Sequence, residues 1–121
     1  MKRLFAIPLL LALAACAPVS SSGSGTTNAG TPITGDRFTY AGFREDVKFS
    51  SVEGWSCEGT TSLYDMYEKG HTSTSFPVTC NNGVKGKITM ALAHRLRDRL
   101  GPGDIHYSFR LDSGVMGQFR I

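Results

Sequence analysis

The densest group of charges in this chain of 121 residues is the run His94-Arg95-Leu96-Arg97-Asp98-Arg99. On an extended strand alternate residues share a face, so Arg95, Arg97 and Arg99 would form a ladder of guanidinium groups. Guanidinium groups bind phosphate and carboxylate groups, so the ladder predicts an anionic partner. The competing interpretation is an ordinary solvated face, on which Asp98 neutralises part of the charge.

Two other sets of side chains could act on sugars. Asp65 and Glu68 are nearby carboxylates such as glycoside hydrolases use, although next to a turn such residues are more commonly solvated surface. Trp55, Tyr64 and Tyr67 could stack on sugar rings, although in a small domain aromatic residues are more commonly core. The chain contains no Gly-x-Ser-x-Gly, Ser-x-x-Lys or Gly-rich phosphate motif. We therefore predict neither an enzyme nor a cofactor.

The first residues of the chain have the pattern of an export signal. Lys2 and Arg3 precede an apolar stretch over residues 4–14, and small residues follow it. The stretch is too short to cross a bilayer as a helix, which takes about 20 apolar residues. Pro8 within the stretch also disfavours a long helix.

This segment ends in Leu13-Ala14-Ala15-Cys16, and the whole resembles the signal and lipobox of a bacterial lipoprotein. The resemblance implies that residues 1–15 are a signal peptide that is removed. It also implies that Cys16 becomes the first residue, carries lipid on its thiol and holds the protein at a membrane. In this family an Asp after the cysteine commonly retains the protein at the inner membrane. Ala17 stands there instead, which favours the outer membrane, on the side that faces the periplasm.

Cys57 and Cys80 remain as an even pair in an oxidising compartment, which predicts a disulfide. A loop of that size would stabilise the fold by about 3 kcal/mol. The alternative is a metal site that adds one of His71, His94 or His106 to the two thiols. The spacing matches no common metal-binding motif, so we predict no metal site.

The residues after Cys16 are rich in Gly, Ser and Thr, which predicts a flexible linker. With the lipidated cysteine that the resemblance implies, this segment covers residues 16–35. The folded domain is then expected over residues 36–121. The formal charge of the chain is +3, but Lys2 and Arg3 leave with the signal peptide and the remainder is close to neutral. This balance, together with export, predicts no nucleic-acid partner.

Within the domain, residues 81–90 and 112–121 are two copies of one pattern. Each copy has two polar residues, a Gly-Val pair, a second glycine and then alternating apolar residues. Alternation with a period of two is typical of a half-buried strand, and the polar-Gly pairs favour tight hairpin turns. The second glycine, Gly86 or Gly117, indicates a bulge or a close approach of backbones.

Further strands are expected over residues 37–43, 47–51, 54–57 and 84–92, the last with Lys85, Lys87 and Thr89 outward. The fold class predicted is all-β, a small antiparallel barrel or sandwich of about six to eight short strands with one disulfide.

Two segments fit both helix and strand. In residues 62–69, Leu63 and Met66 lie between Ser62 and Gly70, as in a short capped helix. In residues 91–100, leucines recur every four positions before a Gly-Pro pair, yet apolar residues also alternate. We expect strand in both segments because the flanking segments are β-like.

These observations favour a membrane-anchored envelope lipoprotein whose non-enzymatic β-domain binds another envelope component. Its partners would be the membrane, through the lipid on Cys16, and an envelope protein, peptidoglycan or lipopolysaccharide. The alternative is an inhibitor of lysozyme or of a protease, since periplasmic lysozyme inhibitors are also small disulfide-bonded β-barrels. Their Ser-Gly-x-x-Tyr motif is missing here, because Val115-Met116-Gly117 follows Ser113-Gly114.

Overall fold

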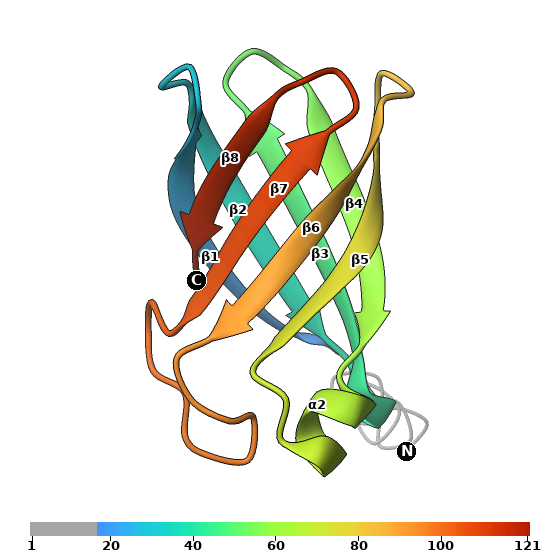
Figure 1. The fold of residues 1–121 in the computed structure, drawn as a ribbon, viewed down its shortest axis with the longest axis vertical. Helices are drawn as coiled ribbons and strands as arrows, with labels where there is room; N and C mark the ends of the chain where they lie inside the picture. The colour runs from blue at the N-terminus through green and yellow to red at the C-terminus, as the bar shows by residue number, and fades with distance from the viewer. Residues whose placement is uncertain (1–16) are drawn as a thin grey trace, which may run out of the picture.

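Eight antiparallel strands, paired in the order in which they follow one another along the chain, close into a barrel (Figure 1). The computed structural model describes residues 17–121. The strands are β1 (Val19–Thr27), β2 (Pro32–Thr39), β3 (Arg44–Ser51), β4 (Ser56–Ser62), β5 (Ser73–Cys80), β6 (Lys85–Leu92), β7 (Ile105–Leu111) and β8 (Met116–Arg120). The prediction of an all-β fold, a small antiparallel barrel or sandwich of about six to eight strands, is confirmed, and the architecture is the barrel.

The two ends of the barrel differ in their connections. Tight turns at 28–31, 52–55, 81–84 and 112–115 join the strands at one end, here called the hairpin end. Gly83 and Gly114, the matching glycines of the two sequence copies, have φ values of 84° and 94°, which a tight turn requires. The predicted hairpins of both copies are therefore confirmed.

The opposite end, here called the helix end, carries the longer connections. A short 3-10 turn, η2 (Ala41–Phe43), joins β2 to β3, the helix α2 (Tyr64–Lys69) joins β4 to β5, and the loop 93–104 joins β6 to β7. The first residue of β1 also lies at this end, and β8 runs toward it from the hairpin end (Figure 1). No helix in residues 17–121 is long and apolar enough to cross a membrane.

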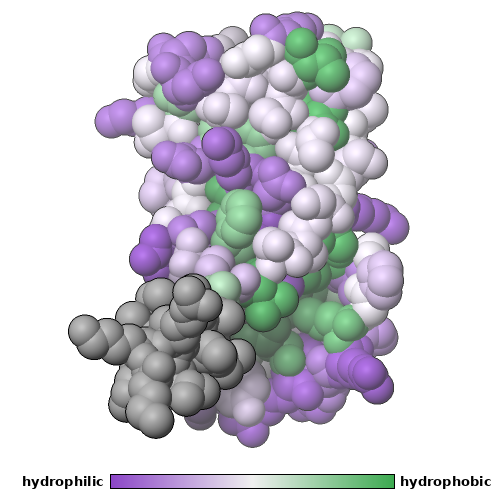
Figure 2. Space-filling model, turned by 180° about the vertical axis from the view of Figure 1, so that it is seen from behind, coloured by the Kyte–Doolittle hydropathy of each residue, from purple (hydrophilic) through white to green (hydrophobic). Residues whose placement is uncertain are grey.

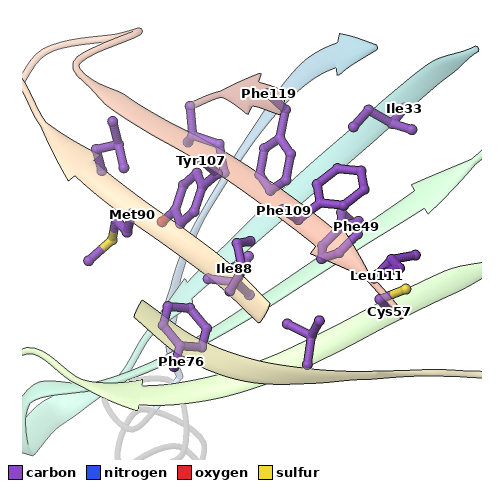
Figure 3. Close-up of a cluster of buried hydrophobic side chains, with 14 of the residues drawn as sticks. Ile33, Phe49, Cys57, Phe76, Ile88, Met90, Tyr107, Phe109, Leu111 and Phe119 are labelled. Carbon is purple, nitrogen blue, oxygen red and sulfur yellow. The ribbon is translucent and has the colours of Figure 1, made fainter. Parts of the chain in front are cut away.

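Aromatic side chains fill the interior of the barrel (Figure 3). The ring centroids of Phe49 and Phe109 are 4.4 Å apart, and those of Tyr107 and Phe119 are 4.9 Å apart. Burial of each such side chain contributes about 1.5–3 kcal/mol, so this stack is a main source of stability. An eight-stranded barrel is just wide enough for side chains to fill it, and these rings do so.

The prediction of a flexible linker over residues 16–35 is wrong for the part that the structure describes. Residues 19–27 form β1, and 32–35 begin β2, so the barrel starts at Val19 rather than at position 36. Gly23 and Gly25 occupy inward positions of β1, where a Cβ would collide with the backbone of β8. Glycine lets the two strands approach, which is the physical reason for the composition. The predicted signal peptide and Cys16 lie outside the described residues.

The expectation of strand in the two ambiguous segments is also wrong. Residues 64–69 form the helix α2, which ends at Gly70 with φ 69°, a left-handed C-cap. Strand β6 ends at Leu92, and the residues that follow it form a loop. Leu96 and Leu100 in this loop are half-buried and pack against the core. The leucines that suggested a regular element therefore cover the end of the barrel.

The predicted disulfide between Cys57 and Cys80 is confirmed. It lies in the ladder between β4 and β5, which is the shortest of the barrel. This ladder has two residue pairs, Cys57 with Cys80 and Glu58 with Thr79. Pro77, two residues before Thr79 on β5, has no N–H group to donate, so it cannot extend the ladder beyond the Glu58–Thr79 pair. The covalent bond reinforces the weakest seam of the barrel wall.

Candidate anion-binding face

The predicted ladder of Arg95, Arg97 and Arg99 does not exist, because all three residues lie in the loop 93–104 rather than on a strand. Arg97 donates from Nε to the carbonyl oxygen of Tyr67 at 2.9 Å, and its guanidinium lies 4.5 Å from the centre of the Tyr67 ring. These contacts fix the loop onto α2. The loop therefore uses Arg97 to hold itself in place.

The acidic residues near these arginines are paired with cations. Glu68 Oε2 lies 3.7 Å from Arg97 Nη2, and Asp65 Oδ1 lies 3.8 Å from Lys69 Nζ. Asp65 and Glu68 thus belong to exposed ion pairs on α2. The two carboxylates are therefore not arranged as the acid and base of a glycoside hydrolase.

The three aromatic residues considered for sugar stacking do not share a surface. Trp55 is at the hairpin end, where its ring lies 6.2 Å from that of Phe49. Tyr64 and Tyr67 are at the helix end, 5.5 and 5.2 Å from the ring of Phe43. The structure therefore separates Trp55 from the two tyrosines by the length of the barrel.

The alternative metal site of two thiols and one histidine is not formed, because the disulfide uses both thiols. His71 and His94 are exposed at the helix end, and His106 Nε2 lies 3.0 Å from Gln118 Oε1 on the outer face of the barrel. In residues 17–121 no group of three or more His, Cys, Asp or Glu side chains could hold a metal ion.

A different set of cations does share one face, the outer side of β6, β7 and β8, which is toward the viewer in Figure 1. Lys85 and Lys87 point outward from β6, as the alternation predicted, and Arg110 points outward from β7. Lys87 and Arg110 are directly opposite each other in the β6–β7 ladder. Like charges in such a position repel each other and destabilise a sheet.

Within residues 17–121, no carboxylate forms an ion pair with Lys85, Lys87 or Arg110, although Asp112 lies on the same face. The opposite side of the barrel, seen in Figure 2, mixes hydrophilic and hydrophobic side chains. On β3 and β4 cations lie close to carboxylates. Arg44 Nη2 lies 2.9 Å from Asp46 Oδ2, and Lys48 is opposite Glu58. The uncompensated positive charge is therefore concentrated on β6 and β7.

The same three cations, together with the single carboxylate of Asp112, line a hollow of about 910 Å³ on the outer side of β6, β7 and β8. Thr89 and Ser108, opposite each other in the ladder, add hydroxyl groups to its wall, and the exposed Met116 adds an apolar side chain. Such a wall offers charge-assisted hydrogen bonds to an anion and neutral ones to hydroxyl groups beside it. We call this set of six residues, Lys85, Lys87, Thr89, Ser108, Arg110 and Met116, the basic hollow.

The second glycine of each sequence copy lies in the wall of this hollow. A Cβ on Gly86 would lie 2.8 Å from Leu111 Cδ2, and one on Gly117 would lie 2.6 Å from Phe109 Cζ. Both glycines therefore allow close packing on the inner side of the strands, as the sequence indicated. Each copy of the repeated sequence pattern therefore contributes one glycine to the wall of the hollow.

Alternation along the sequence places Lys85, Lys87 and Thr89 outward, but it does not predict the basic hollow. The missing information was the register that puts Arg110 opposite Lys87. Comparisons of the chain with known protein families, with curated proteins and with solved structures found no match.

Proposed function

We propose that the protein is a lipid-anchored bacterial envelope lipoprotein whose barrel binds an anionic component of the envelope without catalysing a reaction. The observation that carries the binding function is the uncompensated pair Lys87 and Arg110 within the basic hollow. The sequence Leu13-Ala14-Ala15-Cys16 supports the lipid anchor, through its resemblance to a lipobox. Export to the periplasm agrees with the disulfide, which persists in oxidising compartments.

Binding of an anion relieves the repulsion between the two opposed cations. A carboxylate or phosphate between them turns a destabilising contact into two favourable ones. Arg110 can donate two parallel hydrogen bonds to such a group, whereas Lys87 acts as a compact point charge. Each charge-assisted hydrogen bond contributes about 1.5–3 kcal/mol, so two of them account for measurable affinity.

Among the partner classes expected from the sequence, the composition of the basic hollow favours peptidoglycan. Its peptide stems carry carboxylates, and its glycan strands carry hydroxyl groups. The cations Lys87 and Arg110 match the former, and the hydroxyl groups of Thr89 and Ser108 match the latter. The hollow is open along the outside of the barrel, so a long polymer can cross it without threading.

The test is sedimentation of the acylated, detergent-solubilised protein with purified peptidoglycan. We expect Lys87→Gln together with Arg110→Gln to weaken binding about tenfold or more, because two charge-assisted bonds are lost. The matched control, Arg95→Gln with Arg99→Gln, removes the same charge from the loop 93–104 and should bind like the wild type.

Peptidoglycan with amidated carboxylates provides the complementary control, and we expect it to bind weakly to the wild type. Equal binding by the wild type and the Lys87, Arg110 double variant would exclude the basic hollow as the site. Binding to lipopolysaccharide or to an acidic envelope protein in place of peptidoglycan would contradict the assignment of the partner.

The inhibitor function is the second candidate, and the disulfide-closed barrel is the observation that favours it. This architecture is the one that periplasmic lysozyme inhibitors share. Titration of lysozyme and of periplasmic proteases with the purified protein tests it. Stoichiometric loss of their activity, unchanged by the Lys87 and Arg110 substitutions, would favour inhibition over binding at the basic hollow.

A further inference from the structure

The chain enters the barrel at the helix end, because β1 runs from there to the hairpin that joins it to β2. Val19, the first residue of β1, comes three residues after Cys16. An extended chain advances at most about 3.6 Å per residue, so three residues reach about 11 Å. A linker over residues 16–35 would have let the barrel stand well away from a bilayer, and β1 removes that freedom.

We propose that the helix end lies against the headgroup layer of the bilayer that holds Cys16. This orientation rests on the proposed acylation of Cys16 and adds to it the surface that meets the lipid. The short connection from Cys16 to Val19 sets the distance. The antiparallel order of the strands then decides which of the two ends is near the membrane.

The side chains of the helix end suit a headgroup layer. Four cations are exposed there, one on α2 and three in the loop 93–104: Lys69, Arg95, Arg97 and Arg99. The turns of the hairpin end contain no Lys or Arg and include the acidic Glu53 and Asp112. Lipid phosphates accept hydrogen bonds from guanidinium and ammonium groups, so the helix end is the better match to a phospholipid surface.

Charge alone does not hold this end at the membrane. Asp65, Glu68 and Asp98 lie at the same end, each within 4 Å of a cation, so its net charge is small. The acyl chains supply the affinity, and the protein surface sets the orientation. Tyr64, whose residue is 53% exposed, presents an aromatic ring with a polar tip, a type of side chain that is enriched at membrane interfaces.

This orientation places the basic hollow away from the bilayer. Lys85 is seven residues from Leu92 along β6, which ends at the helix end. With a rise of about 3.3 Å per residue and a strand tilt of about 40°, Lys85 lies about 18 Å further from the membrane. The hollow then opens into the periplasm, where peptidoglycan lies, rather than onto the headgroups.

The experiment compares two tryptophan probes at opposite ends of the acylated full-length protein. The native Trp55 is replaced by Phe, and either Tyr64→Trp at the helix end or Val52→Trp at the hairpin end is added. Both positions are exposed, at 53% and 77%. The proteins are reconstituted in vesicles of phosphatidylethanolamine and phosphatidylglycerol that contain a headgroup-labelled quencher lipid. We expect the quencher to reduce the fluorescence of the Tyr64→Trp protein several-fold more than that of the Val52→Trp protein.

The anchor and the orientation are tested separately. Flotation of the vesicles and mass spectrometry of the N-terminal peptide measure the anchor independently of the quenching. Absence of acyl chains on Cys16 would overturn the anchor and the orientation together. A protein that is acylated and floats, but shows equal quenching at both positions or stronger quenching at position 52, would overturn the orientation alone. The wild type, with Trp55 as its single tryptophan, needs no substitution and should show weak quenching.

Discussion

Cys57 and Cys80 lie directly opposite each other in the β4–β5 ladder, and their disulfide joins the two strands at one of the two residue pairs that this ladder contains. The neighbouring ladders β3–β4 and β5–β6 each extend over seven pairs. The barrel is therefore closed by backbone hydrogen bonds nearly all the way round, and by a covalent bond where these are fewest.

We predict that the double substitution Cys57→Ala, Cys80→Ala lowers the free energy of unfolding by about 3 kcal/mol, because it removes a cross-link over a loop of moderate length. Urea denaturation measures this difference. Hydrogen exchange should show the largest loss of protection in β4 and β5. As a control, a reducing agent should destabilise the wild type and leave the double variant unchanged. A uniform loss of protection around the barrel would contradict the role assigned to the seam.

The ion pair between Arg37 and Glu45 gives a second prediction. The side chain of Glu45 is fully buried and that of Arg37 is 16% exposed, and Arg37 Nε donates to Glu45 Oε1. Glu45→Gln leaves a buried cation without its partner, which should cost about 3 kcal/mol in chemical denaturation. Replacement of both residues, Arg37→Met with Glu45→Leu, should recover much of this loss, because no buried charge remains.

The matched control for that prediction is the pair Arg44 and Asp46 on the outer face of β3, whose side chains are 58% and 25% exposed. Asp46→Asn should cost much less stability than Glu45→Gln, because solvent screens this pair. If the double apolar variant were less stable than Glu45→Gln, the pair would contribute favourably and the prediction would be wrong.

The phenol of Tyr107 gives a pH-dependent prediction. Burial raises the pKa of Tyr107 far above its usual range, and the positive charge of Arg37 offsets part of this rise. A raised pKa in the folded state contributes stability below the unfolded pKa of about 10, and this contribution is lost as the pH rises above it. The loss reaches about 1.4 kcal/mol per pH unit.

The Tyr107→Phe substitution should therefore flatten the fall in stability between about pH 9 and about pH 11. At neutral pH the variant should match or exceed the wild type in stability, because the buried hydroxyl has no hydrogen-bond partner in the described part of the chain. Denaturation curves at several pH values measure both effects. Parallel pH profiles for the two proteins would rule this explanation out.

The alternation of residues predicts most strands of the barrel but not the first one. In β1 the outward positions are Ser20, Ser22, Ser24 and Thr26, and Gly23 and Gly25 point inward. No apolar side chain marks the buried face, so the segment resembles a linker in composition. Its burial comes from the closeness of β8, which is a tertiary contact that no local pattern contains.

The sequence predicts one part of the basic hollow, and the other part again depends on a tertiary contact. The outward positions of Lys85 and Lys87 follow from alternation within one strand. The partnership of Lys87 with Arg110 depends on the register between β6 and β7, which are separated by the loop 93–104. The loop was mispredicted as strand, because apolar residues alternate in it and the flanking segments are β-like. Arg95, Arg97 and Arg99 were therefore expected on one face of a strand that does not form.

The Gly25→Ala substitution tests whether β1 closes the barrel. Its Cβ would collide with the carbonyl oxygen of Gln118 and would lie 2.6 Å from the Phe119 Cα atom. We expect a large loss of stability, seen as a lower melting temperature and faster hydrogen exchange in β1 and β8. The control Ser24→Ala, one residue earlier and outward, should be close to the wild type. Residues in a flexible linker would tolerate both changes equally.

The repulsion between Lys87 and Arg110 predicts a substitution that stabilises the barrel while it weakens binding. Lys87→Glu places a carboxylate opposite Arg110, so a repulsive cross-strand pair becomes an attractive one. Such pairs contribute about 0.2–1 kcal/mol, which chemical denaturation can detect. The same carboxylate pairs with the guanidinium of Arg110 and repels anions. The Lys87→Glu protein should therefore bind peptidoglycan more weakly than the Lys87→Gln protein. A variant that loses both stability and binding would indicate damage to the fold, whereas opposite changes would identify Lys87 as a residue kept for its ligand at the expense of stability.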